Sequence, residues 1–251
     1  MTLRNPDREA VAHGHITNEP IRQKPGVPSW VLKLIMAVTG LLFALFVVGH
    51  MAGNLKLYLP AEGGDEALDE YGAFLRSMGE PLFPHEGALW IIRAVLLVAI
   101  LAHIYGAIAL TARSKASRGK FSRSNLMGGL DSFATKTMLV SGLVLLLFII
   151  FHLLDLTMGV QPIAPGDFAE GAVKANMIAT FSRWPVTIVY VIAMCFLFLH
   201  LTHGIRLAAS DLGITGAKWR QTFLILAYVI PAVVCIGNIV MPLSVALGLV
   251  S

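Results

Sequence analysis

Histidine is the residue type in this sequence best suited to chemistry in an apolar environment. Five of the eight histidines lie inside long apolar segments, where ionisable side chains are rare and usually functional. A single histidine in such a segment is more often a hydrogen-bonded packing residue. Here four successive apolar segments each contain at least one, which favours a shared role as ligands. The five are His50, His103, His152, His200 and His203.

Five apolar segments must position these histidines. About twenty helical residues at about 1.5 Å each span a hydrocarbon core of about 30 Å, and in lipid a helix satisfies its own backbone. Charged residues make up only 14% of the 251 residues, against about 25% in soluble domains. We expect an all-α bundle of five transmembrane helices in one domain, residues 30–251, after a tail of residues 1–29. The segments are approximately Trp30–Leu55, Ala88–Ala112, Thr137–Met158, Pro185–Ala208 and Thr222–Leu249.

The basic residues predict the orientation of this bundle. They gather in the N-terminal tail and in the links after the second and fourth segments, whereas the first link carries seven acids against Lys56 and Arg76. Because cytoplasmic loops hold the excess of Lys and Arg, we expect the N-terminus in the cytoplasm and the C-terminus outside. The first thirty residues are polar and contain four prolines, so we expect no secretory signal peptide. The net charge of +4 is a topology signal and does not indicate nucleic acid.

The depth of each histidine in its segment predicts two pairs. His50 and His152 lie about 9 Å and 7 Å to the outer side of their segment centres, and His103 and His200 about 5 Å and 6 Å to the cytoplasmic side. The two levels are thus about 13 Å apart. An internal echo supports the outer pair, because each of its histidines follows a glycine by ten residues and a phenylalanine by four. The echoed residues are Gly40, Phe46, His50, Gly142, Phe148 and His152.

Two imidazoles at one depth on facing helices can clamp a flat macrocycle. Neutral imidazole suits haem iron, and two axial histidines leave no open position, so such a centre transfers electrons. We therefore predict two haem b groups, the outer held by His50 and His152 and the inner by His103 and His200.

Further residues could complete these centres. Gly53, Gly106 and Gly204 follow their histidines by three or four residues and would leave room for a porphyrin face; close helix packing is the other interpretation. Arg93 and Arg206 are candidates for the haem propionates, although Arg93 could instead snorkel to the interface.

A second metal centre is an alternative to one haem. His203, Cys195 and Cys235 are additional potential ligands inside the apolar segments. Two histidines and two cysteines are the ligand set of a Rieske-type [2Fe–2S] cluster. The other interpretation of the cysteines is that both are small, buried and inert.

The sequence resembles the single-chain, five-helix, dihaem cytochrome b anchors of succinate:quinone oxidoreductases and fumarate reductases. The resemblance covers about residues 30–250. It rests on Gly49-His50-Met51-Ala52-Gly53-Asn54, on Arg93 ten residues before His103, on Phe148-Ile-Ile-Phe151-His152, and on His200-Leu-Thr-His203-Gly204. In that family the ligand precedes this glycine by four residues, which selects His200 over His203.

What the family implies goes beyond the fold. It implies flavoprotein and iron–sulfur partner subunits on the cytoplasmic face of a bacterial plasma membrane, with the dicarboxylate site on a partner. It also implies quinone as the electron acceptor, which we expect to be menaquinone. A higher oligomer is compatible with it.

The quinone could bind at either level. At the outer end, acids and an imidazole could carry protons, and Asp155 lies on about the same helical face as His152. The other interpretation is that most of these acids are solvated loop residues and that Asp155 caps the polar end of its helix. At the inner end fewer groups are present and a partner chain would supply the rest. We favour the outer end. The outer candidates are Tyr71, Arg76, His85, Glu86, Arg93 and Asp155, and the inner ones Ser29, Trp30 and Arg206.

Two other functions remain alternatives. A cytochrome b of a hydrogenase or formate dehydrogenase would also use bis-histidine haems, but its histidine spacing fits less well. A small transporter would show interrupted helices, and only Pro231 hints at one.

Overall fold

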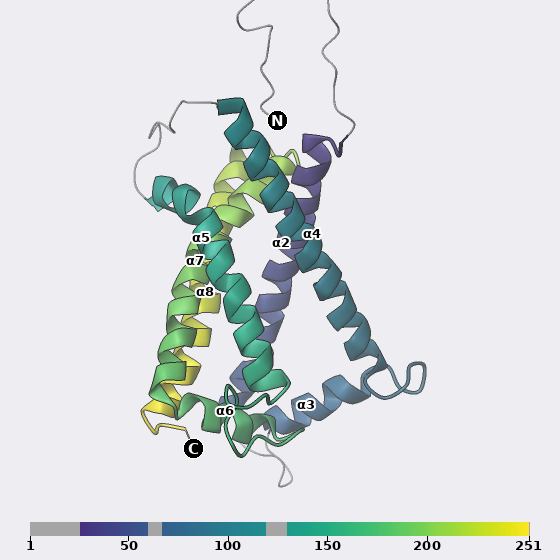
Figure 1. Ribbon diagram of the computed structural model, residues 1–251, viewed down its shortest axis with the longest axis vertical. Coiled ribbons are helices and arrows are strands. Elements are labelled where there is room, and N and C mark those ends of the chain that lie inside the picture. The colour runs from purple at the N-terminus through teal and green to yellow at the C-terminus, as the bar shows by residue number, and fades with distance from the viewer. Residues whose placement is uncertain (1–25, 60–66, 119–129, 251) are drawn as a thin grey trace, which may run out of the picture.

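The computed structural model describes residues 26–59, 67–118 and 130–250, and at residues 118 and 130–136 only their backbone. The predicted tail, 1–29, therefore lies mostly outside the described residues. Within those ranges the regular elements are all helical (Figure 1). They are α2 (Ser29–Asn54), the 3₁₀ turn η1 (Leu55–Tyr58), α3 (Ala67–Ser77), α4 (Gly87–Arg118), α5 (Leu130–His152), the π-helical turn η2 (Leu153–Thr157), α6 (Val173–Phe181), α7 (Trp184–Asp211) and α8 (Ala217–Ala246).

Five of these helices are long and apolar enough to cross a membrane, which confirms the predicted fold class. They begin with α2, α4, α5, α7 and α8, one in each predicted segment. Helical backbone continues beyond the apolar windows, since α4 runs to Arg118 and α8 starts at Ala217. Pro231 and Pro242 lie inside α8 without interrupting it, so the break expected of a transporter is not present there.

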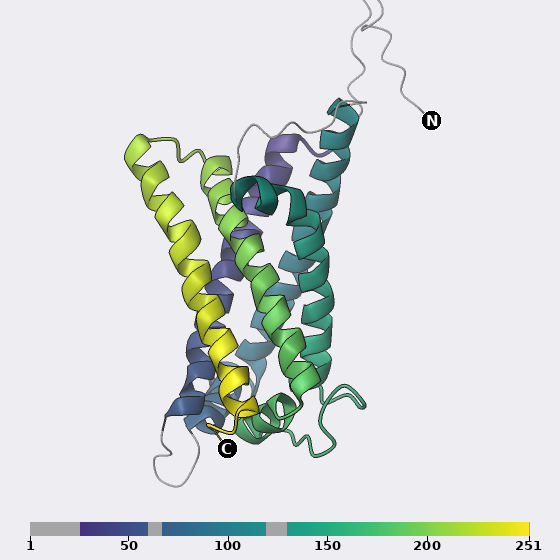
Figure 2. The ribbon, with the colours of Figure 1, turned by 90° about the vertical axis from the view of Figure 1, so that its left-hand side faces the viewer.

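The bundle is organised around α7. This helix packs against α8, α5 and α2, while α4 packs mainly on α2. Figure 2 shows α8, α7 and α5 side by side, and Figure 1 shows α4 crossing α2 and diverging toward the end of the bundle that carries the C-terminus. The outward faces of the long helices are apolar, as a lipid environment requires.

Two short helices close the end of the bundle that carries the C-terminus (Figure 1). The sequence pattern did not predict α3 and α6, which lie in the first and third links. They contact each other, and the Asp69 carboxylate of α3 accepts a hydrogen bond from the backbone N–H of Lys174 in the first turn of α6, at 2.8 Å. A carboxylate there satisfies an orphan N–H and suits the helix dipole.

The opposite end is tied by polar contacts between helix termini. The guanidinium of Arg113 on α4 donates to Ser29 Oγ at 2.8 Å and to the Val27 carbonyl at 2.5 Å. Lys33 on α2 forms an ion pair with Asp211 at the end of α7, at 3.3 Å. The same end therefore joins α2, α4 and α7, the helices that carry three of the four predicted ligands.

Candidate functional site

The four predicted ligands meet in the two expected pairs. The ring centroids of His50 on α2 and His152 on α5 are 5.8 Å apart with the rings nearly perpendicular, at 85°. Those of His103 on α4 and His200 on α7 are 6.3 Å apart at 53°. Four helices thus each contribute one imidazole to two separate pairs.

These separations fit two imidazoles on one metal ion. A metal–imidazole bond is about 2.0–2.1 Å long. With the metal between them on a line, the two ring centroids would be about 6 Å apart. Both pairs have that spacing, which direct packing of two rings would not by itself require.

The second nitrogen of His103 has a partner that fixes its tautomer. Nδ1 of His103 lies 2.9 Å from the hydroxyl of Thr39 on α2. That hydroxyl donates its own hydrogen bond to the backbone carbonyl of Ile35, at 2.6 Å. The hydroxyl must therefore accept the hydrogen bond from Nδ1–H, which leaves the lone pair of the neutral ring on Nε2, where a metal would bind.

The same arrangement recurs at the other member of the inner pair. Nδ1 of His200 lies 3.1 Å from Ser141 Oγ on α5, and Ser141 donates to the Met138 carbonyl at 3.0 Å. His200 therefore also directs Nε2 away from its orienting partner. Outer-shell partners of this kind commonly hold metal-binding histidines.

Thr39 and Ser141 extend the internal echo of the sequence. Each precedes an echoed glycine, and a Cβ on either glycine would lie 3.5 Å from Cε1 of the adjacent inner histidine. The repeated unit thus begins with a hydroxyl residue and a glycine, which lie beside a histidine of the inner pair. It ends eleven residues after the hydroxyl residue with a histidine of the outer pair. Eleven residues rise about 16 Å, so the levels are farther apart than the 13 Å expected from segment centres. The hydroxyls were missed, although both occupy the same place in the echo.

The outer pair is flanked by the echoed phenylalanines. Phe46 stacks on His50 with centroids 5.5 Å apart, and Phe148 on His152 at 5.9 Å. Both phenylalanines lie one helical turn before their histidine, where side chains i and i+4 meet. An apolar hollow of about 430 Å³ lies at the inner level, lined by Thr39, Ala94, Val95, Val98, Ala99 and Ala102.

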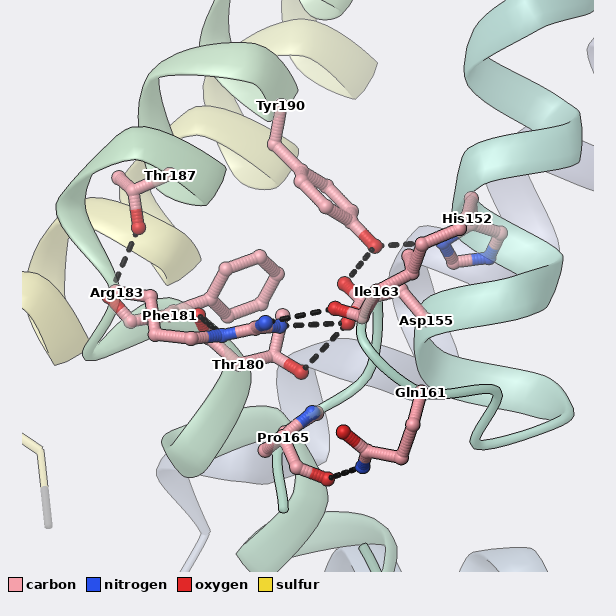
Figure 3. Close-up of polar contacts among 10 residues, drawn as sticks. All are labelled: His152, Asp155, Gln161, Ile163, Pro165, Thr180, Phe181, Arg183, Thr187 and Tyr190. Atoms are coloured by element: carbon pink, nitrogen blue, oxygen red, sulfur yellow. Dashed lines mark hydrogen bonds and ion pairs between the residues drawn. The ribbon is translucent and has the colours of Figure 1, made fainter.

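Nδ1 of His152 contacts a tyrosine. The Tyr190 hydroxyl on α7 lies 3.2 Å from this nitrogen and donates to Asp155 Oδ2 at 3.0 Å (Figure 3). By the same proton count, Tyr190 accepts from Nδ1–H of His152, and Nε2 of this ring again carries the lone pair.

Asp155 is neither a solvated loop acid nor a simple helix cap. It lies in the π-helical turn after His152 with 0% exposure. Arg183 pairs with its Oδ1 at 2.7 Å, and Thr180 donates to the same oxygen at 3.3 Å. Arg183 also donates to the Ile163 carbonyl at 2.7 Å. Figure 3 shows this cluster joining η2 to the start of α7.

Two of the three glycines assigned to porphyrin faces serve helix packing instead. A Cβ at Gly53 would overlap the ring of Tyr71 from α3, and one at Gly106 would lie 2.9 Å from Met36 Sδ on α2. A Cβ at Gly204 would make only an ordinary contact with Met138. For Gly53 and Gly106 the packing interpretation is therefore the correct one.

The remaining outer candidates form a charged cluster. Glu86 pairs with Arg76 at 3.4 Å and with Arg93 at 3.8 Å, and Arg93 also lies over the Trp90 ring at 4.7 Å. Glu86 has φ of 60°, a left-handed conformation that non-glycine residues rarely adopt and that is enriched at functional sites. His85 lies apart from this cluster, paired with Glu80 at 2.9 Å.

The inner candidates are less closely grouped. Ser29 is bonded to Arg113, Trp30 is exposed, and Arg206 lies on the last turns of α7. A hollow of about 390 Å³ occupies the link between α7 and α8, lined by Gly213, Ile214, Thr215, Gly216, Trp219 and Phe223.

The alternative iron–sulfur cluster gains no support from the geometry. In the described part of the chain, no three or more His, Cys, Asp or Glu side chains converge so as to hold a metal ion. Cys235 is buried and donates to the Met194 carbonyl at 3.2 Å, whereas Cys195 is exposed. The cysteines and His203 therefore do not form a ligand set with the histidine pairs.

Comparison with known proteins agrees with this architecture. The family model of the succinate dehydrogenase/fumarate reductase transmembrane subunit matches residues 117–237, which include α5 and α7 with His152 and His200. No curated protein and no solved structure gives a significant match. Five helices long and apolar enough to cross a membrane, together with two histidine pairs, agree with this similarity to the transmembrane subunits of succinate dehydrogenase and fumarate reductase.

Proposed function

We propose that this subunit conducts electrons across the membrane between an iron–sulfur partner and quinone, through two bis-histidine haem b groups. The observation that carries the proposal is the spacing of the two histidine pairs, whose ring centroids lie 5.8 Å and 6.3 Å apart. In three of the four rings a hydroxyl on another helix binds Nδ1 and frees Nε2.

The residues of the chain would hold and insulate these centres. When bound, each haem would supply a one-electron redox couple. The hydroxyls fix tautomer and ring orientation, and the stacked phenylalanines Phe46 and Phe148 add apolar walls that exclude water. Arg93 and Arg206 remain the proposed propionate partners.

The inner end is the proposed docking face for the soluble subunits. The family implies association with a flavoprotein and an iron–sulfur subunit, and the dicarboxylate reaction would occur on them. Basic residues lie in the last turn of α4 and the first turn of α8, namely Lys115, Lys218 and Arg220. By the positive-inside rule these ends face the cytoplasm, and the C-terminus lies outside a bacterial plasma membrane.

The outer end is the proposed quinone site, with menaquinone as the proposed acceptor. Arg76, Glu86 and Arg93 supply hydrogen-bond donors and a carboxylate within one cluster, which joins the end of α3 to the start of α4. Tyr71 connects this region to the His50 helix through Gly53. Asp155 is less suited to carry protons because three side chains already bind it. The hollow beside Trp219 is the inner alternative.

Haem stoichiometry tests the central proposal. The purified complex should show two haem b per chain in a pyridine haemochrome assay. Replacing His103 or His200 by Ala should remove the inner haem, and replacing His50 or His152 the outer one. His203→Ala is the matched control on the same helix and should keep both. Loss of a haem in His203→Ala with both kept in His200→Ala would refute the ligand assignment.

A further inference from the structure

We propose that Tyr190, with the Asp155–Arg183 ion pair behind it, is a positioning residue that lowers the reduction potential of the outer centre. This inference rests on the proposed haem function and deepens it. It predicts that the two centres are tuned by different chemistry, a charged relay at the outer level and neutral hydroxyls at the inner level.

The direction of each hydrogen bond in the relay follows from a count of protons. The Asp155 carboxylate only accepts, and Arg183 only donates. Arg183 binds Oδ1 at 2.7 Å, so the Tyr190 hydroxyl donates to Oδ2 at 3.0 Å. That hydroxyl has no second proton. It must accept from Nδ1–H of His152, which lies 3.2 Å away (Figure 3).

The inner hydroxyls differ from that of Tyr190 in the group to which they donate. Thr39 and Ser141 donate to neutral backbone carbonyls, whereas Tyr190 donates to a carboxylate. A charge-assisted bond polarises the tyrosine oxygen and makes it a stronger acceptor. A stronger acceptor at Nδ1–H raises the basicity of Nε2, and a more basic ligand favours the oxidised iron. The positive charge of Arg183 offsets part of this effect, but it binds the carboxylate oxygen that Tyr190 does not use.

The packing holds the relay in one geometry. Phe148 and Phe181 meet the Tyr190 ring edge-on, with centroids 5.0 Å and 4.9 Å away. The Thr187 hydroxyl is bonded to the Phe181 carbonyl at 2.8 Å, one turn before Tyr190. The ring is therefore fixed by apolar contacts that do not involve its hydroxyl, so removing the oxygen alone leaves the packing intact.

The test is Tyr190→Phe in the intact complex, with a redox titration followed at the haem α bands and by low-spin EPR. Both haems should remain. The outer component should shift to a more positive potential with altered g values, while the inner one stays. The His50→Ala variant, which retains the inner haem alone, identifies the components. Ser141→Ala is the matched control and should move the inner component only.

A double-mutant cycle with Asp155→Asn separates the relay from a simple charge effect. If the carboxylate acts through the tyrosine, Asp155→Asn shifts the outer potential less in the Tyr190→Phe background than in the wild type. Equal shifts in both backgrounds would overturn the relay. If Tyr190→Phe loses the outer haem, Asp155→Asn is read by EPR as well: a positive outer shift with altered g values supports the relay, and a shift with unchanged g values, as expected of a charge acting through space, refutes it.

Two further outcomes would show whether the inference or the proposed function is wrong. Unchanged potentials and g values in Tyr190→Phe, with both haems present, would mean that the tyrosine is only a packing residue and would overturn the inference. A wild-type complex without haem would instead overturn the proposed function.

Discussion

The hydroxyl of Thr39 lies 2.9 Å from Nδ1 of His103 on the neighbouring helix. Ser141 stands in the same relation to His200, at 3.1 Å. Each hydroxyl comes eleven residues before an outer histidine on its own helix. The helices α2 and α5 therefore each orient an inner imidazole and supply an outer one, so the two centres share their structural support.

Replacing Thr39 should weaken the inner centre alone. Thr39→Val keeps the shape and removes the acceptor for Nδ1–H, and loss of an outer-shell partner typically costs about 10–100-fold in metal affinity. Haem content after dilution into detergent measures this loss. Thr39→Ser keeps the hydroxyl and should behave as the wild type. A wild-type haem content in Thr39→Val would contradict the role of the hydroxyl.

Gly53 and Gly106 should respond differently to alanine. At Gly53 the new methyl group would overlap the Tyr71 ring, whereas at Gly106 it meets the flexible thioether of Met36. Overpacking against a ring costs about 1–3 kcal/mol, while methionine adapts its shape. Thermal unfolding in detergent should show the larger loss for Gly53→Ala. Equal midpoints would show that the Tyr71 contact does not constrain the fold.

Breaking the Asp155–Arg183 pair should destabilise the outer end. Arg183→Gln leaves a fully buried carboxylate without its counter-charge, and such losses cost about 3–5 kcal/mol. Because the Arg183 side chain is 30% exposed, we expect a loss of about 3 kcal/mol. The check is unfolding by denaturant, with Asp155→Asn/Arg183→Gln as the control. The double variant should recover part of the stability, and a double loss equal to the sum of the single losses would argue against pairing.

The charged cluster at Glu86 should matter for quinone. Glu86→Gln removes the carboxylate between Arg76 and Arg93, so the quinone reductase rate should fall at least several-fold while both haem spectra stay unchanged. Glu80→Gln, which faces His85 nearby, is the matched control. Wild-type rates in Glu86→Gln would shift the quinone proposal to the inner end.

Cross-linking can test the orientation. An amine-reactive reagent should join the iron–sulfur subunit to Lys115 or Lys218 at the inner end. Lys56 and Lys174, which lie at the outer end with η1 and α6, should remain unlinked. Links to those two lysines instead would invert the proposed topology.

Sequence reasoning found the histidine pairs because helix rise is a fixed quantity and depth follows from counting residues. His50 and His152 share one level by this count, and their ring centroids lie 5.8 Å apart in the structure. It missed Thr39 and Ser141 because hydroxyls in apolar helices usually bond only to their own preceding turn, as both also do here. Which residue on another helix they contact depends on the tertiary structure, which residue spacing within one helix does not give.

The outer end was the hardest part to predict. The α3 and α6 helices are short and depend on contacts with each other, such as Asp69 with the start of α6. The other sequence interpretation of Asp155 was a cap at the polar end of its helix. Its burial depends on Arg183, twenty-eight residues later, which no local pattern connects to it.

The spacing of the two imidazole levels bears on the voltage across the membrane. The levels are about 16 Å apart, roughly half of a 30 Å hydrocarbon core. One charge crossing the whole core at 100 mV exchanges about 2.3 kcal/mol with the field, so an electron passing between the levels exchanges about 1.2 kcal/mol. In the proposed orientation this electron moves from the negative to the positive side. The field therefore assists quinone reduction at the outer end and opposes the reverse reaction, which makes the direction of electron flow depend on the energised state of the membrane.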